Sequence, residues 1–221
     1  HAHFAKAEEH EKAGVKAMAF WVSGSNHFFM RDKPVTKASD LKGMKFSVPS
    51  NTVERMLAKF GAVSIVTGTN DFYDQMSRGI VDGATLANTG PTAVRVDPFI
   101  KHQTSVPGSL YFSGFFIVMN AKKWDALPEE DKKAVWSVSG EALVTAAAKV
   151  FEEMEAVALD GRKKAGVAKM ITADAAFVAD MKREFAFVEE DWIAEAKKLG
   201  FDGAAALAAL RAEAMKLDSA R

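Results

Sequence analysis

The chain has 221 residues, 48% of them hydrophobic, which is enough for a sizeable core in one or two domains. Its 29 Lys and Arg residues balance 29 Asp and Glu residues, so the zero formal net charge gives no reason to expect nucleic acid or an anionic membrane surface as a partner. The absence of cysteine excludes disulfides, Cys-ligated metal sites and thiol catalysis.

Targeting and membrane signals are missing from the sequence. No apolar run reaches the roughly 18 residues that a membrane span requires, so direct membrane insertion is not expected. The first residues, from His1 onward, lack the basic start and apolar stretch of a signal peptide. We therefore expect either a cytosolic chain or a processed or truncated form of an exported one.

The first quarter of the chain predicts a polar helix followed by strands. Residues 3–13 are typical of a polar helix, and Gly14 is placed to end it. The mostly apolar residues 15–22 predict a strand, and a Ser/Gly/Asn turn separates them from a short aromatic strand over residues 27–30. A third strand is expected over residues 44–48.

The next segment alternates between helix and strand. A helix is predicted from Asn51, its expected N-cap, to about residue 60, and the β-branched residues 63–66 predict a strand. A helix over residues 72–78 follows, and the Gly/Thr/Asn-rich residues 82–92 predict a loop that leads into a short helix. This alternation is typical of a βαβ unit.

The last hundred residues are mainly helical. Residues 115–119 form a continuous apolar run, the pattern of a strand buried on both faces. A helical pattern extends from Pro128 to about Ala165 with Gly140 as a soft point or kink, and its length predicts that it spans more than one domain. A strand over residues 168–171 and two or three helices complete the chain.

Catalytic and metal-binding motifs are missing. The sequence has no nucleophile elbow, HExxH motif, phosphate-binding loop or GxGxxG fingerprint. Ser23 and His27 lie too close in sequence to form a triad, and His3 with His10 makes only a two-ligand metal site. We therefore predict no enzymatic activity, no catalytic residue, no cofactor and no metal.

Several segments in a specific order resemble one protein family. They are GVKAMAFW, SNHFFMRDKPVTKASDLKGMKFSVP, FYDQMSRGIVDG and FFIVMNAKKWDALPEEDKKAV, followed by the long helix. Together they resemble the solute-binding subunits of TRAP transporters, the DctP-type periplasmic proteins. The resemblance implies an α/β, two-lobed periplasmic binding protein-like fold with a long lobe-spanning helix.

The resemblance also implies how the chain divides between the lobes. Residues 1–24 would belong to the first lobe and residues 25–112 to the second. Residues 113–152 would return to the first lobe with the start of the bridging helix, and residues 153–221 would complete the second lobe with the C-terminal helices. The opening elements of the family would precede His1, so we expect the first lobe to be incomplete in this chain.

The candidate site follows from the same resemblance. The family pattern K-x-R-x-P places its carboxylate-binding arginine at Ser47, and a second basic position of the family falls at His27. Since neither arginine is present, the ligand is expected to be neutral, or its anion is met by His27 or by groups outside the chain. From the residues alone, Ser47 would be a solvent-facing strand residue and His27 an ordinary strand histidine.

Polar and aromatic residues at the ends of strands complete the predicted site, because ligands of open α/β sheets bind there. Asn88 would take the place of a ligand-binding asparagine of the family, and Tyr111 and Phe112 would stack on a ring-bearing ligand. The charged residues of the long helix, Glu152 to Glu155 and Arg162 to Lys164, read as a solvated face. The predicted ligand-binding residues are His27, Ser47, Pro49, Ser50, Thr85, Leu86, Asn88, Tyr111 and Phe112.

The sequence therefore predicts a periplasmic solute-binding protein, exported with a signal peptide in its precursor. Its partners would be a small organic solute and the membrane subunits of a TRAP transporter. The solute would be an organic acid or, given Ser47, a neutral or aromatic compound. The alternatives are an effector-sensing or enzymatic domain with a similar two-lobed fold, and a fragment that folds only with a missing half.

Overall fold

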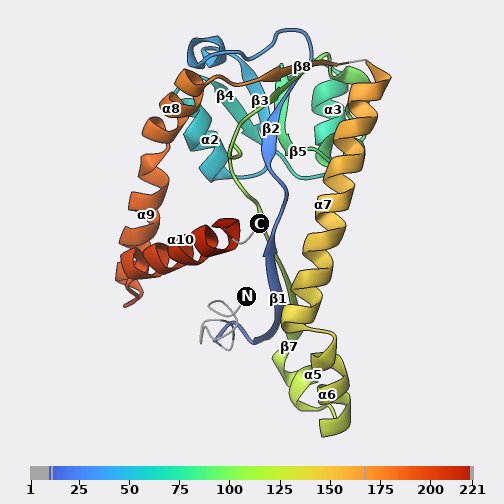
Figure 1. Ribbon diagram of the computed structural model, residues 1–221, viewed down its shortest axis with the longest axis vertical. Helices are drawn as coiled ribbons and strands as arrows, with labels where there is room; N and C mark the ends of the chain where they lie inside the picture. The colour runs from blue at the N-terminus through green and yellow to red at the C-terminus, as the bar shows by residue number, and fades with distance from the viewer. Residues whose placement is uncertain (1–9, 11, 167, 220–221) are drawn as a thin grey trace.

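The computed structural model describes residue 10, residues 12–166 and residues 168–219, and it has an α/β architecture (Figure 1). The helix expected over residues 3–13 lies almost wholly outside these ranges. Figure 1 shows a main sheet at one end of the molecule, a two-stranded sheet below it, and the long helix α7 running beside both.

The main sheet has six strands in the order β4-β3-β5-β2-β6-β8. The strand β3 is parallel to β4 and β5, β2 is antiparallel to β5 and β6, and β6 is parallel to β8. The parallel part is the βαβ arrangement that the alternating pattern predicts. The bounds are β2 Asn26–Met30, β3 Lys45–Val48, β4 Val63–Val66, β5 Gly83–Ala87, β6 His102–Ser105 and β8 Lys169–Thr172.

The strand β5 corrects the prediction of a loop over residues 82–92. Its residues GATLA are small or lack a clear period, so the turn-like composition conceals a strand in the middle of the sheet. A Cβ at Gly83 would lie 2.5 Å from Sδ of Met30 and 2.6 Å from the carbonyl oxygen of Phe29. Glycine is therefore required there for the close approach of β2 and β5. The expected short helix does follow, as α4 over Gly90–Ala93.

Short helices connect the strands of the main sheet. The helix α2 buries Val53, Met56 and Leu57, and its N-cap is Ser50, one residue before the expected cap Asn51. These connecting helices are α2 over Asn51–Ala58 and α3 over Phe72–Ser77, with single 3-10 turns over Ala38–Leu41 and Asp97–Phe99.

Apolar clusters cover both faces of the main sheet. On one face, Phe28 and Phe46 pack with residues of α2 and with Phe177 of α8. On the other face, Phe29 packs with Phe72 of α3 and with Val96 and Ile100. Alternate residues of β2 thus enter opposite cores, as the two-residue period of a strand requires.

The two-stranded sheet pairs β1 (Val15–Val22) with β7 (Gly114–Asn120) antiparallel. The prediction that residues 115–119 are buried on both faces is wrong for the described part of the chain, where Phe116 is 63% exposed and Phe115 is 41% exposed. The physical reason is that β7 pairs with β1 alone within the described residues, so no further strand continues this sheet, and α7 covers it only in part, through contacts such as that of Phe151 with Phe115.

Helices occupy most of the rest of the chain. The expected helix from Pro128 to Ala165 is divided into two, because α6 ends at Ser137 and α7 begins at Gly140, which has a φ of 58°. Three helices follow β8, in agreement with the sequence. The bounds are α5 Ala121–Asp125, α6 Glu129–Ser137, α7 Gly140–Ala165, α8 Ala175–Glu184, α9 Ala186–Lys198 and α10 Gly203–Ser219.

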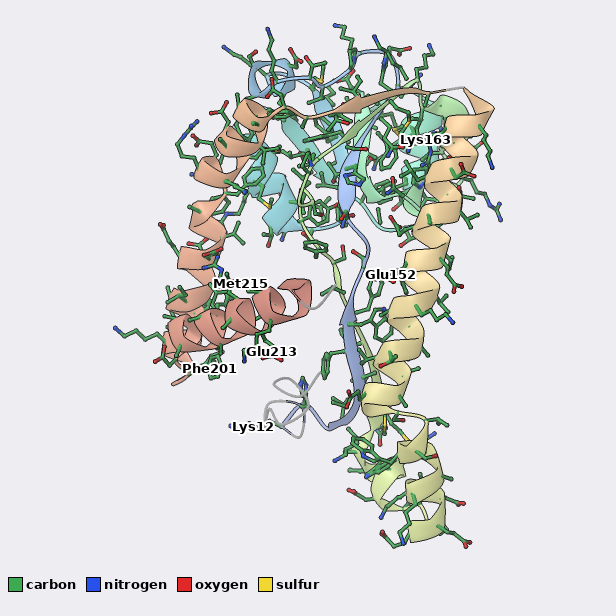
Figure 2. The ribbon with its side chains drawn as sticks, viewed as in Figure 1. Lys12, Glu152, Lys163, Phe201, Glu213 and Met215 are labelled. Atoms are coloured by element: carbon green, nitrogen blue, oxygen red, sulfur yellow. The ribbon has the colours of Figure 1, made fainter. Side chains whose placement is uncertain are left out.

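The arrangement places the end of the main sheet beside the middle of α7. Figure 2 shows Glu152 near the level of the connection between β1 and β2, below the main sheet, and Lys163 beside the main sheet. Within the described residues, no helix combines the length and apolar character that crossing a bilayer requires. The division of the chain into four lobe segments stays a prediction.

Candidate functional site

A groove of about 1120 Å³ lies between α7 and the end of the main sheet. Its walls are mainly apolar and include the rings of Phe115 from β7 and Phe151 from α7, whose centroids are 5.7 Å apart. Four of the predicted ligand-binding residues line it, namely Pro49, Thr85, Leu86 and Tyr111. These four come from three segments that are far apart in the sequence, so the fold brings them together at one sheet edge.

Tyr111 is fixed at the groove by its hydroxyl group. The hydroxyl donates to the carbonyl oxygen of Thr85 over 2.9 Å and lies 3.0 Å from Oγ1 of the same residue. Burial raises the pKa of Tyr111 well above its usual value, although the hydrogen bond from Thr85 opposes this. Tyr111 therefore offers the groove a neutral ring. Phe112, the next residue, is 54% exposed and does not line the groove.

His27 is buried in the sheet beside the groove. It pairs across the strands with Leu86, and its Nδ1 accepts a hydrogen bond from the backbone N–H of Val106 over 3.1 Å. Burial lowers the pKa of His27 below the ordinary value of 6.5, and the charge of Glu155 partly offsets this effect. Burial therefore favours the neutral imidazole to a lower pH than in an exposed histidine.

The lowered pKa of His27 predicts a dependence of stability on pH. Below the unfolded-state pKa of 6.5, the unfolded chain binds a proton that folded His27 does not, so acidification favours unfolding. Above 6.5 this contribution vanishes. We expect the His27→Gln variant to lose less stability than the wild type between about pH 7 and about pH 5, as measured by urea denaturation at each pH. If the free energy of unfolding depended on pH equally in the two proteins, the lowered pKa of His27 would be contradicted.

Asn88 is held at three of its polar groups. Its backbone N–H donates to Oε2 of Glu155 over 2.9 Å, and its carbonyl oxygen accepts from Nη2 of Arg162 over 2.8 Å. Its side-chain oxygen accepts from Nε2 of Gln103 over 2.7 Å. Asn88 is 7% exposed, and its neighbours Ala87 and Thr89 line the groove.

Ser47 and Ser50 are engaged in contacts within the protein. Ser47 is fully buried, which makes its interpretation as a solvent-facing residue wrong, and its hydroxyl donates to Oε1 of Gln75. Gln75 also accepts from Thr67 over 3.1 Å. The hydroxyl of Ser50 caps α2 by accepting from the N–H of Val53. Neither serine lines the groove.

Two charged residues of α7 turn toward the sheet and correct the prediction of a solvated face. Glu155 accepts from the N–H groups of Asn88 and Thr89 and from the Thr89 hydroxyl, at 2.9 to 3.0 Å. The Arg162 side chain is 4% exposed and pairs with Asp97 at 3.3 Å. Together they fasten α7 to the turn between β5 and α4.

The sequence does contain a signal for these two residues. Glu155 and Arg162 are seven positions apart, so they share one face of the helix. Phe151 and Ala158 continue the same stripe, and both line the groove. Within the described residues, no cluster of three or more His, Cys, Asp or Glu side chains is arranged to hold a metal ion.

Comparisons with known proteins point to one class. A TRAP periplasmic solute-binding protein from Bordetella bronchiseptica, solved with bound mandelate, is 27% identical with a TM-score of 0.88, covering 95% of this chain and 66% of that one. A TRAP solute-binding protein from Rhodoferax ferrireducens, solved with copurified benzoate, is 26% identical with the same TM-score, covering 99% and 69%. The Outer membrane transporter protein TsaT of Comamonas testosteroni is 28% identical over 213 residues.

The chain spans 62% of the length of TsaT, while 96% of its own length is matched. The family described as Bacterial extracellular solute-binding protein, family 7, matches residues 4–192. The match to a family of solute-binding proteins confirms the prediction of a non-enzyme. The chain therefore belongs to family 7 of the bacterial extracellular solute-binding proteins, the DctP family of TRAP solute-binding proteins.

Proposed function

We propose that this protein captures an aromatic organic acid in the groove between α7 and the main sheet. The aromatic wall of the groove is the observation that carries the proposal. The rings of Phe115 and Phe151 line the groove with centroids 5.7 Å apart, and Trp21, which does not line the groove, stacks on Phe115 at 5.8 Å and supports this wall. A flat apolar ring can pack against such a wall, since aromatic rings prefer offset or edge contacts at these distances.

The relatives support the same class of ligand. The Bordetella protein holds mandelate and the Rhodoferax protein holds benzoate, and each of these ligands joins a phenyl ring to a carboxylate. In this chain the hydroxyl of Ser47 already donates to Gln75, so Ser47 is not the group that meets the ligand. We assign that role to donors near the start of β2 and the end of β5, where His27 and Asn88 lie.

The proposed cellular role follows from the family. A solute-binding protein of this kind would act in the periplasm, where it would deliver its solute to the membrane subunits of a TRAP transporter. Release to those subunits requires that the solute be bound without covalent change, which agrees with an apolar groove that holds few polar groups.

Isothermal titration of the purified chain tests the proposal. We expect benzoate and mandelate to bind, with benzoate at least about tenfold tighter than either cyclohexanecarboxylate, which lacks the aromatic ring, or benzyl alcohol, which lacks the carboxylate. Tighter binding of benzyl alcohol would mean a neutral ligand and would contradict the proposed acid. Absence of heat with every aromatic acid would overturn the proposal.

A matched pair of variants places the ligand. The Leu86→Glu change sets a carboxylate on the groove wall, where it would repel an acid and narrow the space, so benzoate binding should be lost. The Ile80→Glu change adds the same charge at a position that is 45% exposed and outside the groove. Ile80→Glu should bind benzoate like the wild type, and equal losses in both variants would contradict the location.

A further inference from the structure

Two amide side chains in series connect a buried arginine to the edge of the groove. Nη1 of Arg162 donates to Oε1 of Gln103 over 3.2 Å, and Nε2 of Gln103 donates to Oδ1 of Asn88 over 2.7 Å. The Arg162 side chain is 4% exposed and Gln103 is fully buried. We call the three residues the amide relay.

The chemistry of arginine fixes the orientation of both amides. A guanidinium group has donors and no acceptor, so Gln103 must turn its oxygen toward Arg162. Gln103 then turns its NH₂ group toward Asn88, and Asn88 must accept this hydrogen bond through its side-chain oxygen. The NH₂ group of Asn88 is therefore directed away from the relay, and it is the end of the side chain that remains for other partners.

The NH₂ group of Asn88 makes no hydrogen bond within the described part of the chain. Asn88 as a whole is only 7% exposed, but its Nδ2 atom is not fully enclosed. The backbone of Asn88 is tied on both sides, through its N–H to Glu155 and through its carbonyl oxygen to Arg162. The donor is thus held in place before any ligand arrives.

His27 presents a second donor by the same kind of argument. Its Nδ1 accepts from the N–H of Val106, so the proton of the neutral ring resides on Nε2. His27 pairs with Leu86, a groove residue, and side chains of paired residues lie on the same face of a sheet. Asn88 follows Leu86 by two positions, so both donors belong to the face of the sheet toward α7.

We propose that the amide relay and the N–H of Val106 set the polarity of the solute site, so that Asn88 and His27 both act as donors and select an acceptor oxygen of the solute. Arg162 and Gln103 are positioning residues in this scheme and do not touch the solute. The inference rests on the proposed function and deepens it, because a carboxylate offers only acceptors, whereas an amidinium of the same shape offers only donors.

The relay itself is tested without any ligand, by using NMR to measure how fast the side-chain amide protons exchange with solvent. In the wild type, the NH₂ protons of Gln103 should exchange slowly and those of Asn88 rapidly. In the Gln103→Glu variant the new carboxylate still accepts from Arg162, now as an ion pair, but offers Asn88 only acceptors. Asn88 must then turn its NH₂ group inward, and its protons should become protected. Rapid exchange of the Asn88 protons in both proteins would overturn the relay.

The consequence for binding is tested with benzoate and benzamidinium, which share shape and differ in polarity. The wild type should prefer benzoate. In Gln103→Glu the ratio of the two affinities should fall by about tenfold or more, as expected when a charged hydrogen bond is lost. An unchanged ratio would overturn the inference.

Two further variants separate polarity from charge and from folding. Gln103→Met breaks the relay without a charge, and it should shift the ratio in the same direction by a smaller factor. Thr104→Val removes a hydrogen bond to the carbonyl oxygen of Val35 from an equally buried neighbour on β6, and it should leave the ratio unchanged. Failure of the wild type to bind benzoate would count against the proposed function alone, because the exchange experiment still decides the relay.

Discussion

Replacing Arg162 by methionine should lower the free energy of unfolding by about 3 kcal/mol, the lower end of the range for breaking a buried ion pair from one side. The lower end applies because the Asp97 side chain is 37% exposed and regains water. The variant leaves the oxygen of Gln103 and the carbonyl oxygen of Asn88 without their donor, and it removes a guanidinium that lies 5.2 Å from the ring of Phe29.

Urea denaturation followed by circular dichroism measures this loss, and the same helix supplies the control. Lys164 is 77% exposed and pairs with Asp160 at 2.6 Å, so Lys164→Met removes a cation from an ion pair at the surface. That change should alter the free energy of unfolding by about 0.5 kcal/mol or less. Equal midpoints for Arg162→Met and the wild type would show that the buried network does not fasten α7 to the sheet.

The predicted elements with strong periodicity agree with the structure. Residues 15–22 and 63–66 are strands with the expected bounds, because β-branched or aromatic runs between turn residues leave few other options. The strand β5 is the opposite case. Its small residues carry no period, and only packing between β2 and β3 makes them a strand. Propensity is a weak guide where neighbours on both sides decide the structure.

The residues of the candidate site likewise divide into those that the sequence predicts and those that only the tertiary fold brings together. Pro49, Thr85, Leu86 and Tyr111 line the groove, as expected of residues near the ends of strands. The spacing of Glu155 and Arg162 places them on one face of α7, but their burial against the sheet does not follow from local sequence, since charged residues on a helix usually face solvent. Their partners come from residues 59 to 74 positions away, and only the tertiary fold brings such groups together.

Ser47 shows the limit of reasoning from a single strand. Its position predicts a side chain at the surface, and the structure buries it under Gln75, which lies 28 residues later on α3. Gln75 accepts from both Ser47 and Thr67, so a neutral amide satisfies the two hydroxyl groups at the position where the family pattern has an arginine.

Truncation of Phe28 should have the larger effect on the main sheet, with a loss of about 4 kcal/mol in the free energy of unfolding for Phe28→Ala. Phe28 is fully buried, and its ring lies 5.9 Å from that of Phe46 and 6.2 Å from that of Phe177, with which it is stacked at 14°. These rings join β2, β3 and α8, so the cavity left by the change would weaken contacts among three distant segments.

The control for Phe28→Ala is Phe116→Ala, which removes an equal side chain from a position that is 63% exposed. We expect it to cost about 1 kcal/mol or less, because little apolar surface is returned to water. Phe28→Ala should also weaken benzoate binding at a temperature where the variant is still folded, since β2 carries His27 next to the lost ring. Equal unfolding midpoints for the two variants would mean that the core around Phe28 does not hold the sheet, and with it the donors of the site, in place.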